Sequence, residues 1–370
     1  MSHLDRQRQG ATDTGITRAM PLTFTTLNDI LANAADTIID VRTPAEFAGD
    51  HIPGAINLPA LSNDQRAEIG TMYVQDSPFK ARKRGAAMVA RNVADHLDGP
   101  LRDKDGGWQP LVYCWRGGQR SGSFASILQQ IGWRAETIAG GYQTFRRLVH
   151  QYLYETPLPH RIILLDGNTG TGKTALLARL RLQGVQVIDL EGLAHHRGSM
   201  LGQMPTPQPS QKAFETALAC ALVRCDPDQP VIIEAESSKI GRINLPPSLW
   251  SVMCAAPRVM ISASLDARAA FLANAYADVT ADLDDLRQRL QPMRYIKSHA
   301  TVNAWEDLLD ANNLKALAAS LMQTHYDSAY DKARDGHVFD LVGHIHAETL
   351  DDAGLAKVTN QIAALINPAG

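Results

Sequence analysis

One segment of the sequence has the residue types and the spacing of a phosphate-binding loop. Residues 167–174 read Gly-Asn-Thr-Gly-Thr-Gly-Lys-Thr and match the pattern GxxxxGK[ST]. Glycines let successive backbone N–H groups turn toward phosphate oxygens, and a helix that starts there adds its positive end. Lys173 would reach the terminal phosphates, and the Thr174 hydroxyl would bind Mg²⁺. We predict that a di- or triphosphate is bound by Gly167, Asn168, Thr169, Gly170, Thr171, Gly172, Lys173 and Thr174.

Two carboxylates at the end of the strand predicted over 231–234 could serve the phosphate-binding loop. Residues 231–234 are apolar up to Glu234, and Glu236 comes two positions later. Glu234 or Glu236 could hold Mg²⁺ together with Thr174, the ion to be expected beside a bound phosphate chain. The alternative is a strand-end carboxylate that makes only a local cap. No guanine-recognition sequence of the NKxD type follows, and a diphosphate alone would fill the loop, so a nucleoside triphosphate is not required.

A second reactive pattern is a cysteine loop. Residues 114–121 read Cys-Trp-Arg-Gly-Gly-Gln-Arg-Ser, after an apolar strand and before a helix predicted over 124–130. In such a loop the backbone N–H groups point at the sulfur and, with Arg116 and Arg120, stabilise a thiolate and any bound anion. A Cys-x5-Arg loop can hold a nucleophile against phosphate, sulfur or selenium species. We predict that Cys114, Arg116 and Arg120 are catalytic.

Composition limits the class of protein to an ordinary soluble one. The 370 residues suffice for two or three domains, 45% are hydrophobic and 20% charged, and no apolar run is long enough to span a bilayer. The net charge of −3 neither predicts nor excludes a nucleic-acid partner. Four cysteines are too few for a disulfide framework, and no secretory signal is visible, so we expect a cytoplasmic protein without membrane partners. Cys220, Cys225 and Cys254 are predicted to be core thiols.

The order of predicted elements indicates two α/β domains. A tail over 1–20 precedes strands at 37–41, 54–58, 110–114 and 136–138 and a long helix over 79–97. Prolines 157 and 159 suit a linker over 151–160. A second alternation comprises strands at 161–166, 185–190, 231–234 and 259–262, with helices from 173 and over 211–224, and residues 282–366 are mostly helical in period. Strands separated by helices imply parallel sheets.

Two further motifs assign the first domain. Asp-Val-Arg-Thr-Pro-Ala-Glu-Phe at 40–47 and His-Ile-Pro-Gly-Ala-Ile-Asn at 51–57 precede the cysteine loop, and in this order residues 21–150 resemble a rhodanese domain. The resemblance implies that Cys114 carries the chalcogen; Asp40, Arg42 and Glu46 are interpreted as a structural charge network. Cys114 to Arg120 spans seven residues, where many rhodaneses have six, so simple thiosulfate sulfurtransferase activity is not favoured.

A rhodanese-like parallel-sheet domain followed by a P-loop NTPase-like α/β domain (161–370) with a helical C-terminal part resembles the tRNA 2-selenouridine synthase family. Shorter motifs at 70–73, 77–81, 189–191, 196–199, 208–212 and 325–327 belong to the resemblance. It implies replacement of the 2-thio sulfur of uridine 34 by selenium, with selenophosphate and geranyl diphosphate as co-substrates and an S-geranyl intermediate. No tightly bound organic cofactor is implied. The implied partner is the anticodon loop of 2-thiouridine-containing tRNA, with the selenophosphate-producing enzyme as a further candidate.

Under this resemblance several side chains are candidates for contact with RNA or for lining the ligand cleft. Basic side chains would contact phosphates and an aromatic one would stack on a flipped base, which selects Lys80, Arg82, Lys83, Arg84, Arg294, Lys297 and Trp115. Each basic cluster could equally be a solvated helix face. We assign to the cleft Asp189, Glu191, His196, Arg197 and Ser199, against the alternative of a plain glycine-turn loop.

Two other functions remain open at this point. A P-loop kinase or NTP-driven switch with a rhodanese-type phosphatase module would also use both loops, and ATP turnover without tRNA would favour it. A sulfur-carrier protein that binds nucleotide only structurally would show thiosulfate:cyanide transfer.

Overall fold

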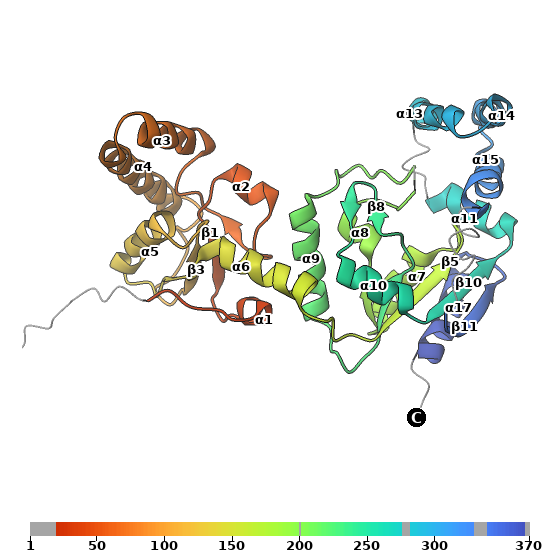
Figure 1. Cartoon of the computed structure of the whole chain (residues 1–370), viewed down its shortest axis with the longest axis horizontal. Coiled ribbons are helices and arrows are strands. Elements are labelled where there is room, and N and C mark those ends of the chain that lie inside the picture. The colour runs from red at the N-terminus through yellow and green to blue at the C-terminus, as the bar shows by residue number, and fades with distance from the viewer. Residues whose placement is uncertain (1–19, 200, 276–281, 329–338, 367–370) are drawn as a thin grey trace, which may run out of the picture. The chain divides into compact units, whose positions relative to one another are not determined.

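A computed structural model describes residues 20–199, 201–275, 282–328 and 339–366, and its contacts divide the chain into two compact units, Met1–Leu148 and Val149–Gly370. Figure 1 shows both units. The tail predicted over residues 1–20 lies, apart from Met20, outside the described residues. No described helix is both long and apolar enough to cross a membrane.

The first unit is built on a four-stranded parallel sheet in the order β2-β1-β3-β4. All four predicted strands are present; three are one residue shorter than predicted, and the strand predicted over 54–58 is reduced to Ile56–Asn57. The strands and helices are β1 (Thr37–Asp40), β2 (Ile56–Asn57), β3 (Pro110–Tyr113), β4 (Glu136–Thr137), α1 (Leu27–Leu31), α2 (Pro44–Gly49), α3 (Asn63–Gln75), α4 (Pro78–Asp98), α5 (Gln119–Ile131) and α6 (Gly141–His150).

Helix caps in this unit follow from the sequence. Thr43 and Glu46 form a capping box at the start of α2, and Ser77 caps α4, which begins at Pro78. The long helix predicted over 79–97 is therefore α4 with one more residue at each end. Helices α3 and α4 pack side by side, and α4 and α5 contribute Val93, Phe124 and Leu128 to the core over the sheet.

The second unit has a five-stranded parallel sheet in the order β11-β10-β5-β7-β6. Its strands are β5 (Ile162–Gly167), β6 (Gln186–Ile188), β7 (Val231–Glu234), β10 (Arg258–Ala263) and β11 (Leu341–Ala347), with a small hairpin of β8 (Lys239–Ile240) and β9 (Ile243–Asn244). The phosphate-loop strand β5 is central, so the loop that follows it lies between the ends of β7 and β10.

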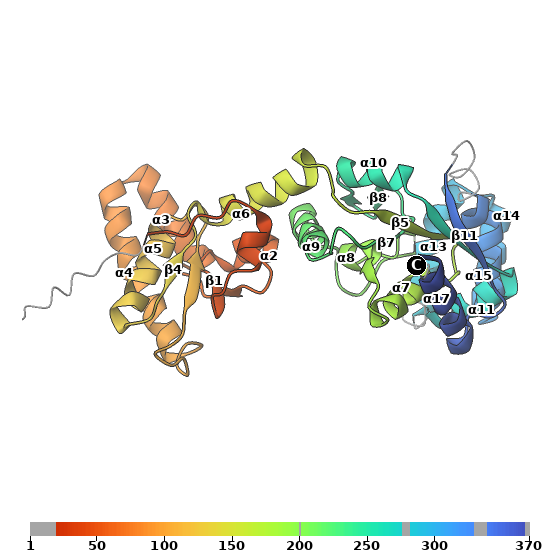
Figure 2. The same ribbon diagram turned by 90° about the horizontal axis from the view of Figure 1, so that it is seen from below.

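Helices cover this sheet, and further helices form an arm. Helices α7 (Lys173–Leu182) and α17 (Asp352–Ile366) lie side by side (Figure 2) and share a core with β5 and β10. The other described helices are η1 (Gln151–Glu155), α8 (Leu190–Ala194), α9 (Gln211–Val223), α10 (Pro247–Ala255), α11 (Leu265–Ala275), α13 (Leu283–Leu290), η2 (Gln291–Tyr295), α14 (His299–Asp310), α15 (Leu314–Leu321) and η3 (Met322–Tyr326).

Two features differ from the predicted elements. Residues 151–155, predicted as the start of a linker, form the π-helical turn η1 directly after α6. The described residues between 282 and 366 are mostly helical, as predicted, but they include β11, an edge strand with Gly343 and two histidines. The helical arm α13–α15 has its own core around Leu290, Trp305 and Leu317.

Candidate functional site

The phosphate loop of the second unit connects the buried strand β5 to helix α7. Gly172 takes a left-handed φ of 77° as the N-cap of α7, and Gly170 has a φ of 84°, so both positions favour glycine. A side chain at Gly167 would lie 2.6 Å from the carbonyl oxygen of Ile261 on β10. Lys173 folds back along the loop, where its Nζ donates to the Gly167 carbonyl at 2.8 Å. The loop has the form that backbone recognition of phosphates needs.

An acidic cluster lies beside Lys173 and Thr174. The Thr174 hydroxyl donates to Glu191 Oε2 at 3.1 Å, and Glu191 is hydrogen-bonded to Glu236. Burial, followed by repulsion from Glu236, raises the pKa of Glu191 to about 8. Burial also raises the pKa of Glu236, against the lowering effect of Lys173. Two carboxyl groups this close share a proton near neutral pH.

Glu234 has a different place from the one expected of a metal ligand. It is 2% exposed, and its Oε1 accepts the backbone N–H of Glu191 at 2.7 Å. Its Oε2 has no hydrogen-bond partner among the described residues, and burial raises its pKa well above the ordinary value. Asp189 caps α8 by accepting from the Gly192 N–H. Both residues thus orient Glu191, which is the carboxylate that touches Thr174.

These oxygens suit Mg²⁺ that is shared with a substrate phosphate. Such sites use one or two carboxylates, a hydroxyl, phosphate oxygens and water. Thr174 and Glu191, with Glu236 adjacent, supply the protein part of this set. No group of three or more His, Cys, Asp or Glu side chains in the described parts of the chain forms an all-protein metal site.

The segment predicted to line the cleft closes over the carboxylates. A side chain at Gly198, whose φ is 65°, would lie 2.6 Å from Glu236 Oε2 and 2.9 Å from Glu191 Oε1. Arg197 and Ser199 line the cavity beside the phosphate loop, as do Asp189 and Glu191. His196 is buried outside that cavity, and burial lowers its pKa.

The cavity at the phosphate loop has a volume of about 1000 Å³ and two kinds of wall. One wall consists of loop residues 169–174 and the acidic cluster. The other is apolar, with Met204, Trp250, Met253, Phe271, Leu272 and Tyr326. Cys254, predicted as a core thiol, is instead exposed and lines this cavity, whereas Cys220 is buried and Cys225 is half-buried. Such a cavity suits a ligand with an anionic end and a hydrocarbon part.

Two arginines, one that lines this cavity and one that contacts the phosphate loop, were not singled out in the sequence. Arg258 at the start of β10 pairs with buried Asp166 at 2.7 Å and lines the cavity. Arg268 of α11 pairs with both carboxylate oxygens of Asp327, at 2.8 and 2.9 Å, and donates to the Thr169 carbonyl at 3.2 Å. Asp327 also accepts from the Asn168 amide. Arg258 belongs to no sequence motif. Its role becomes visible only from its ion pair with Asp166 of β5.

The cysteine loop of the first unit surrounds a buried sulfur with hydrogen-bond donors. Cys114 is 3% exposed, and its Sγ accepts from the Gly118 N–H at 3.3 Å and from the Ser121 hydroxyl at 3.2 Å. The start of α6 supports the loop, because the Tyr142 N–H donates to the Cys114 carbonyl at 2.8 Å. A side chain at Gly141 would lie 2.2 Å from that carbonyl oxygen. Gly141 therefore holds the loop in place, although sequence reasoning did not select it.

The two arginines of this loop differ in their surroundings. Arg120 makes a two-pronged ion pair with Glu46, at 2.7 and 3.2 Å. Burial alone would raise the pKa of Glu46, but the hydrogen bonds from Arg120 and from the Thr43 N–H outweigh it and lower the pKa. Arg116 is exposed and lines a second cavity, which leads to Cys114. Asp40 and Arg42 form the buried part of the expected charge network, at 2.6 Å.

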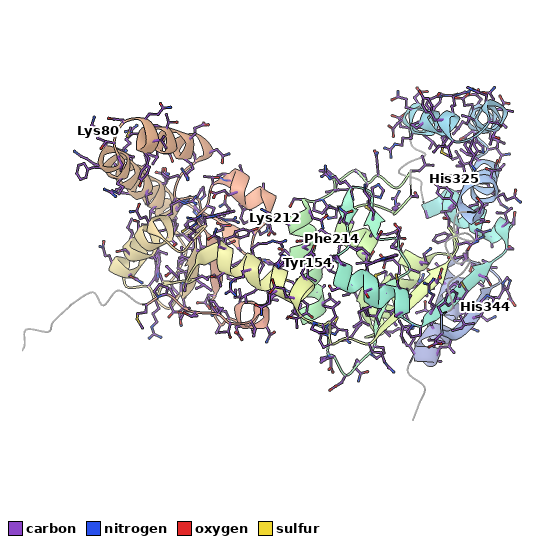
Figure 3. All side chains as sticks on the ribbon, in the orientation of Figure 1. Lys80, Tyr154, Lys212, Phe214, His325 and His344 are labelled. Carbon is purple, nitrogen blue, oxygen red and sulfur yellow. The ribbon has the colours of Figure 1, made fainter. Side chains whose placement is uncertain are left out.

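A cavity of about 800 Å³ leads to Cys114 and carries positive charge. Arg66, Arg82, Arg116 and Arg120 line it, and no acidic residue does. Trp115 and half-exposed Tyr73 add aromatic surface. Of the other predicted RNA contacts in this unit, Lys80 at the start of α4 (Figure 3) pairs with Asp76, Arg84 pairs with Glu68, and Lys83 is exposed.

The predicted RNA contacts of the second unit lie in the helical arm. Arg294 is hydrogen-bonded to Gln291, His299, Asn303 and Glu306, the last at 2.7 Å, and its contact with RNA stays a prediction. Lys297 donates to the Thr324 carbonyl, next to His325 (Figure 3). Burial and the charge of Lys297 lower the pKa of His325.

Comparison with known proteins agrees with this geometry. The rhodanese-like domain family matches residues 23–148, and the family described as "tRNA 2-selenouridine synthase AAA domain" matches residues 160–281. Curated tRNA 2-selenouridine synthases share 37% identity over 267 residues (Hahella chejuensis), 36% over 246 (Shewanella halifaxensis) and 32% over 322 (Sulfurovum sp.). These alignments cover 71, 65 and 80% of this chain and 68, 65 and 87% of the relatives. The chain therefore belongs to the tRNA 2-selenouridine synthase family.

Proposed function

We propose that the chain replaces the C2 sulfur of 2-thiouridine at tRNA position 34 by selenium in two steps, in the cytoplasm, with one step at each cavity. The observation that carries the proposal is the phosphate loop set against an apolar wall in one cavity, in a chain that also holds a cysteine loop. The first cavity suits an allylic diphosphate, and the second suits a selenium-bearing anion.

The first step is alkylation of sulfur. The thiocarbonyl sulfur forms a bond to C1 of geranyl diphosphate, the C1–O bond breaks, and the base loses its N3 proton to give neutral S-geranyl-2-thiouridine. Negative charge develops on the departing diphosphate, where Lys173 and the loop N–H groups of residues 168–172 would stabilise it. Mg²⁺ held by Thr174 and Glu191 would neutralise further phosphate charge when bound. Arg258, which lines the same cavity and is paired with Asp166, adds a further cation.

The second step exchanges sulfur for selenium. The S-geranyl group makes the sulfur at C2 a leaving group: selenium forms a bond to C2, the C2–S bond breaks, and geranyl thiol departs with a proton. Selenophosphate supplies the selenium, and water takes up its phosphoryl group as phosphate. Cys114 and Arg116 act on this donor, and the electropositive cavity suits its charge. The four arginines that line the cavity at Cys114 would contact tRNA phosphates. Tyr73 or Trp115 would stack on a flipped base.

Nucleoside mass spectrometry of thiolated tRNA tests both steps. Geranyl diphosphate and Mg²⁺ are added first and selenophosphate second, with the wild type and with Lys173→Ala and Cys114→Ala. Lys173→Ala should form no S-geranyl nucleoside, whereas Cys114→Ala should form it and make no selenouridine. Lys357→Ala and Cys225→Ala serve as matched controls. Absence of product at either stage with the wild type contradicts the proposal, and ATP consumption without tRNA would favour a P-loop kinase instead.

A further inference from the structure

A second, smaller cavity opens beside the phosphate loop. Its volume is about 70 Å³, and it shares Thr169, Ser199, Leu272 and Tyr326 with the main cavity. Apart from Thr169, Ser199 and Tyr326, every lining residue is aliphatic or methionine. We call this cavity the leucine pocket and define it by Leu272 of α11, Leu286 of α13 and Leu314, Leu317 and Leu321 of α15.

The leucine pocket is a gap where close packing is expected. Leu286, Leu317 and Leu321 belong to the core of the helical arm and are at most 7% exposed. Protein cores usually leave few voids larger than a water molecule, because each unfilled volume loses dispersion contacts. A void with apolar walls is poorly hydrated and accepts a hydrocarbon. Because Thr169 of the phosphate loop lines the pocket, a hydrocarbon in the pocket could belong to a ligand whose diphosphate is bound by that loop.

Size and polarity restrict the occupant. One water-sized group takes roughly 10–15 Å³ of such volume, so the pocket holds about five to seven heavy atoms. That number fits one five-carbon isoprene unit. A nucleobase is excluded, because its polar edges would be buried without partners against the leucines. The apolar wall of the main cavity, at Phe271, Leu272 and Tyr326, supplies apolar surface for one more isoprene unit.

We propose that the leucine pocket binds the distal isoprene unit of a ten-carbon allylic diphosphate and sets the chain length that the enzyme accepts. The inference rests on the proposed function, which places an allylic diphosphate at the phosphate loop. Leu272 and Tyr326, which line both cavities, mark the passage between the two isoprene units. Leu317 and Leu321 are the wall against which a longer chain would collide.

Filling the pocket tests the assignment. Ala318 and Ala273 line it, so Ala318→Leu and Ala273→Leu occupy its volume and leave the surrounding leucines in place. The exposed Ala300 of α14 gives the matched control Ala300→Leu. Calorimetry with Mg²⁺ would measure binding of geranyl diphosphate (two isoprene units), dimethylallyl diphosphate (one unit) and inorganic diphosphate to each full-length variant.

Burial of each methylene-sized group gains roughly fourfold in affinity, so the five extra carbons of geranyl diphosphate should let the wild type bind it up to about 1000-fold more tightly than dimethylallyl diphosphate. Both filling variants should lose most of this ratio while their affinity for inorganic diphosphate stays unchanged, and Ala300→Leu should behave as the wild type. Leu317→Ala, checked for folding by thermal unfolding, should bind farnesyl diphosphate more tightly than the wild type does. If Leu317→Ala does not fold, Ala318→Leu and Ala273→Leu still decide whether the leucine pocket binds the distal isoprene unit.

Failure of this inference differs from failure of the proposed function. An unchanged geranyl-to-dimethylallyl ratio in both filling variants would overturn the leucine pocket, even if geranyl transfer to tRNA proceeds. A wild type that binds geranyl diphosphate no more tightly than inorganic diphosphate would overturn it as well. A wild type that shows the expected ratio but transfers no geranyl group to thiolated tRNA would contradict the proposed reaction and leave the pocket assignment standing.

Discussion

The sulfur of Cys114 is buried, yet it is surrounded by groups that favour a negative charge. Two donors, the Gly118 N–H and the Ser121 hydroxyl, point at Sγ. Hydrogen bonds to a charged acceptor are stronger than those to a neutral one, so both donors would stabilise negative charge that develops on Sγ during a reaction. The reactivity of Cys114 thus depends on residues that do not themselves react, such as Ser121.

We predict that Ser121→Ala slows modification of Cys114. A hydrogen bond to a charged group contributes about 1.5–3 kcal/mol, so loss of this donor should slow alkylation by iodoacetamide roughly tenfold at pH 7. The rate is measured by peptide mass spectrometry. Ser123→Ala is the control, because Ser123 is exposed, lines the same cavity and makes no contact with Sγ among the hydrogen bonds of the loop. Equal rates in both variants would contradict a role for Ser121.

The Glu191–Glu236 pair makes stability depend on pH. Burial and repulsion from Glu236 raise the pKa of Glu191 from 4.5 to about 8 in the folded protein. Between these values the folded state binds more protons than the unfolded state, so the free energy of unfolding falls as the pH rises from 4.5 to 8. Below 4.5 both states are protonated, and this loss is absent.

Glu191→Gln should therefore change the pH profile in one direction. Glutamine does not ionise, so between pH 5 and pH 8 the variant should gain stability relative to the wild type, by an amount on the order of 2 kcal/mol. Urea unfolding without Mg²⁺ at both values measures the difference. Glu348→Gln, a change at an exposed carboxylate of the same unit, should show no relative gain. If Glu348→Gln gained as much stability relative to the wild type between pH 5 and pH 8, the Glu191–Glu236 pair would not be the source of the pH dependence.

At the scale of elements, the Arg268–Asp327 pair joins three segments. Arg268 lies on α11, Asp327 directly follows η3, and both reach the phosphate loop through Thr169 and Asn168. Removing one partner of a largely buried ion pair leaves an uncompensated charge, which costs more than an exposed pair contributes. The pair therefore positions the loop from outside the motif that binds phosphate.

Asp327→Ala should lower the melting temperature and weaken inorganic diphosphate binding by about tenfold or more, since roughly 1.4 kcal/mol corresponds to tenfold. Asp327→Asn, which keeps an oxygen acceptor for Asn168, should fall between the wild type and Asp327→Ala. Asp310→Ala breaks a more exposed pair with Arg287 and is the control. Diphosphate affinity that is unchanged in a less stable Asp327→Ala would assign the pair to stability alone.

Elements with a strong periodic pattern or a motif were predictable from the sequence. β5, α7 and α9 lie where they were predicted, because apolar runs, a glycine loop and a Ser210 cap mark their limits. β11 was missed, because Gly343, His344 and His346 interrupt the apolar pattern of an edge strand whose pairing to β10 is entirely non-local.

Site residues followed the same division. Lys173, Thr174 and Cys114 belong to local motifs and could be predicted, whereas Arg258, Gly141 and the leucine pocket depend on contacts between segments far apart in the sequence. Glu191 was selected for the cleft, but its contact with Thr174 depends on how α8 follows β6. Arg294 stays a predicted RNA contact, and its hydrogen bonds to neighbouring side chains, such as the one to Glu306, were not predictable from the sequence pattern.

At the scale of the whole molecule, each unit has its own core and its own cavity. The core around Phe124 in the first unit and the core around Leu165 in the second contain no residue in common. A substitution in one cavity should therefore leave the other unit folded. If the two steps occur at separate cavities, a chain that lacks one step should still perform the other.

A mixture of Cys114→Ala and Lys173→Ala chains tests this division of labour. Cys114→Ala should convert thiolated tRNA to the S-geranyl form, and Lys173→Ala should take up that tRNA and selenate it. The mixture should form selenouridine, more slowly than the wild type and with a rate that rises with total protein concentration, because the intermediate must pass between molecules. Nucleoside mass spectrometry over time measures both products. A mixture that accumulates S-geranyl nucleoside but never selenouridine would mean that both steps must occur within one chain without release of the tRNA.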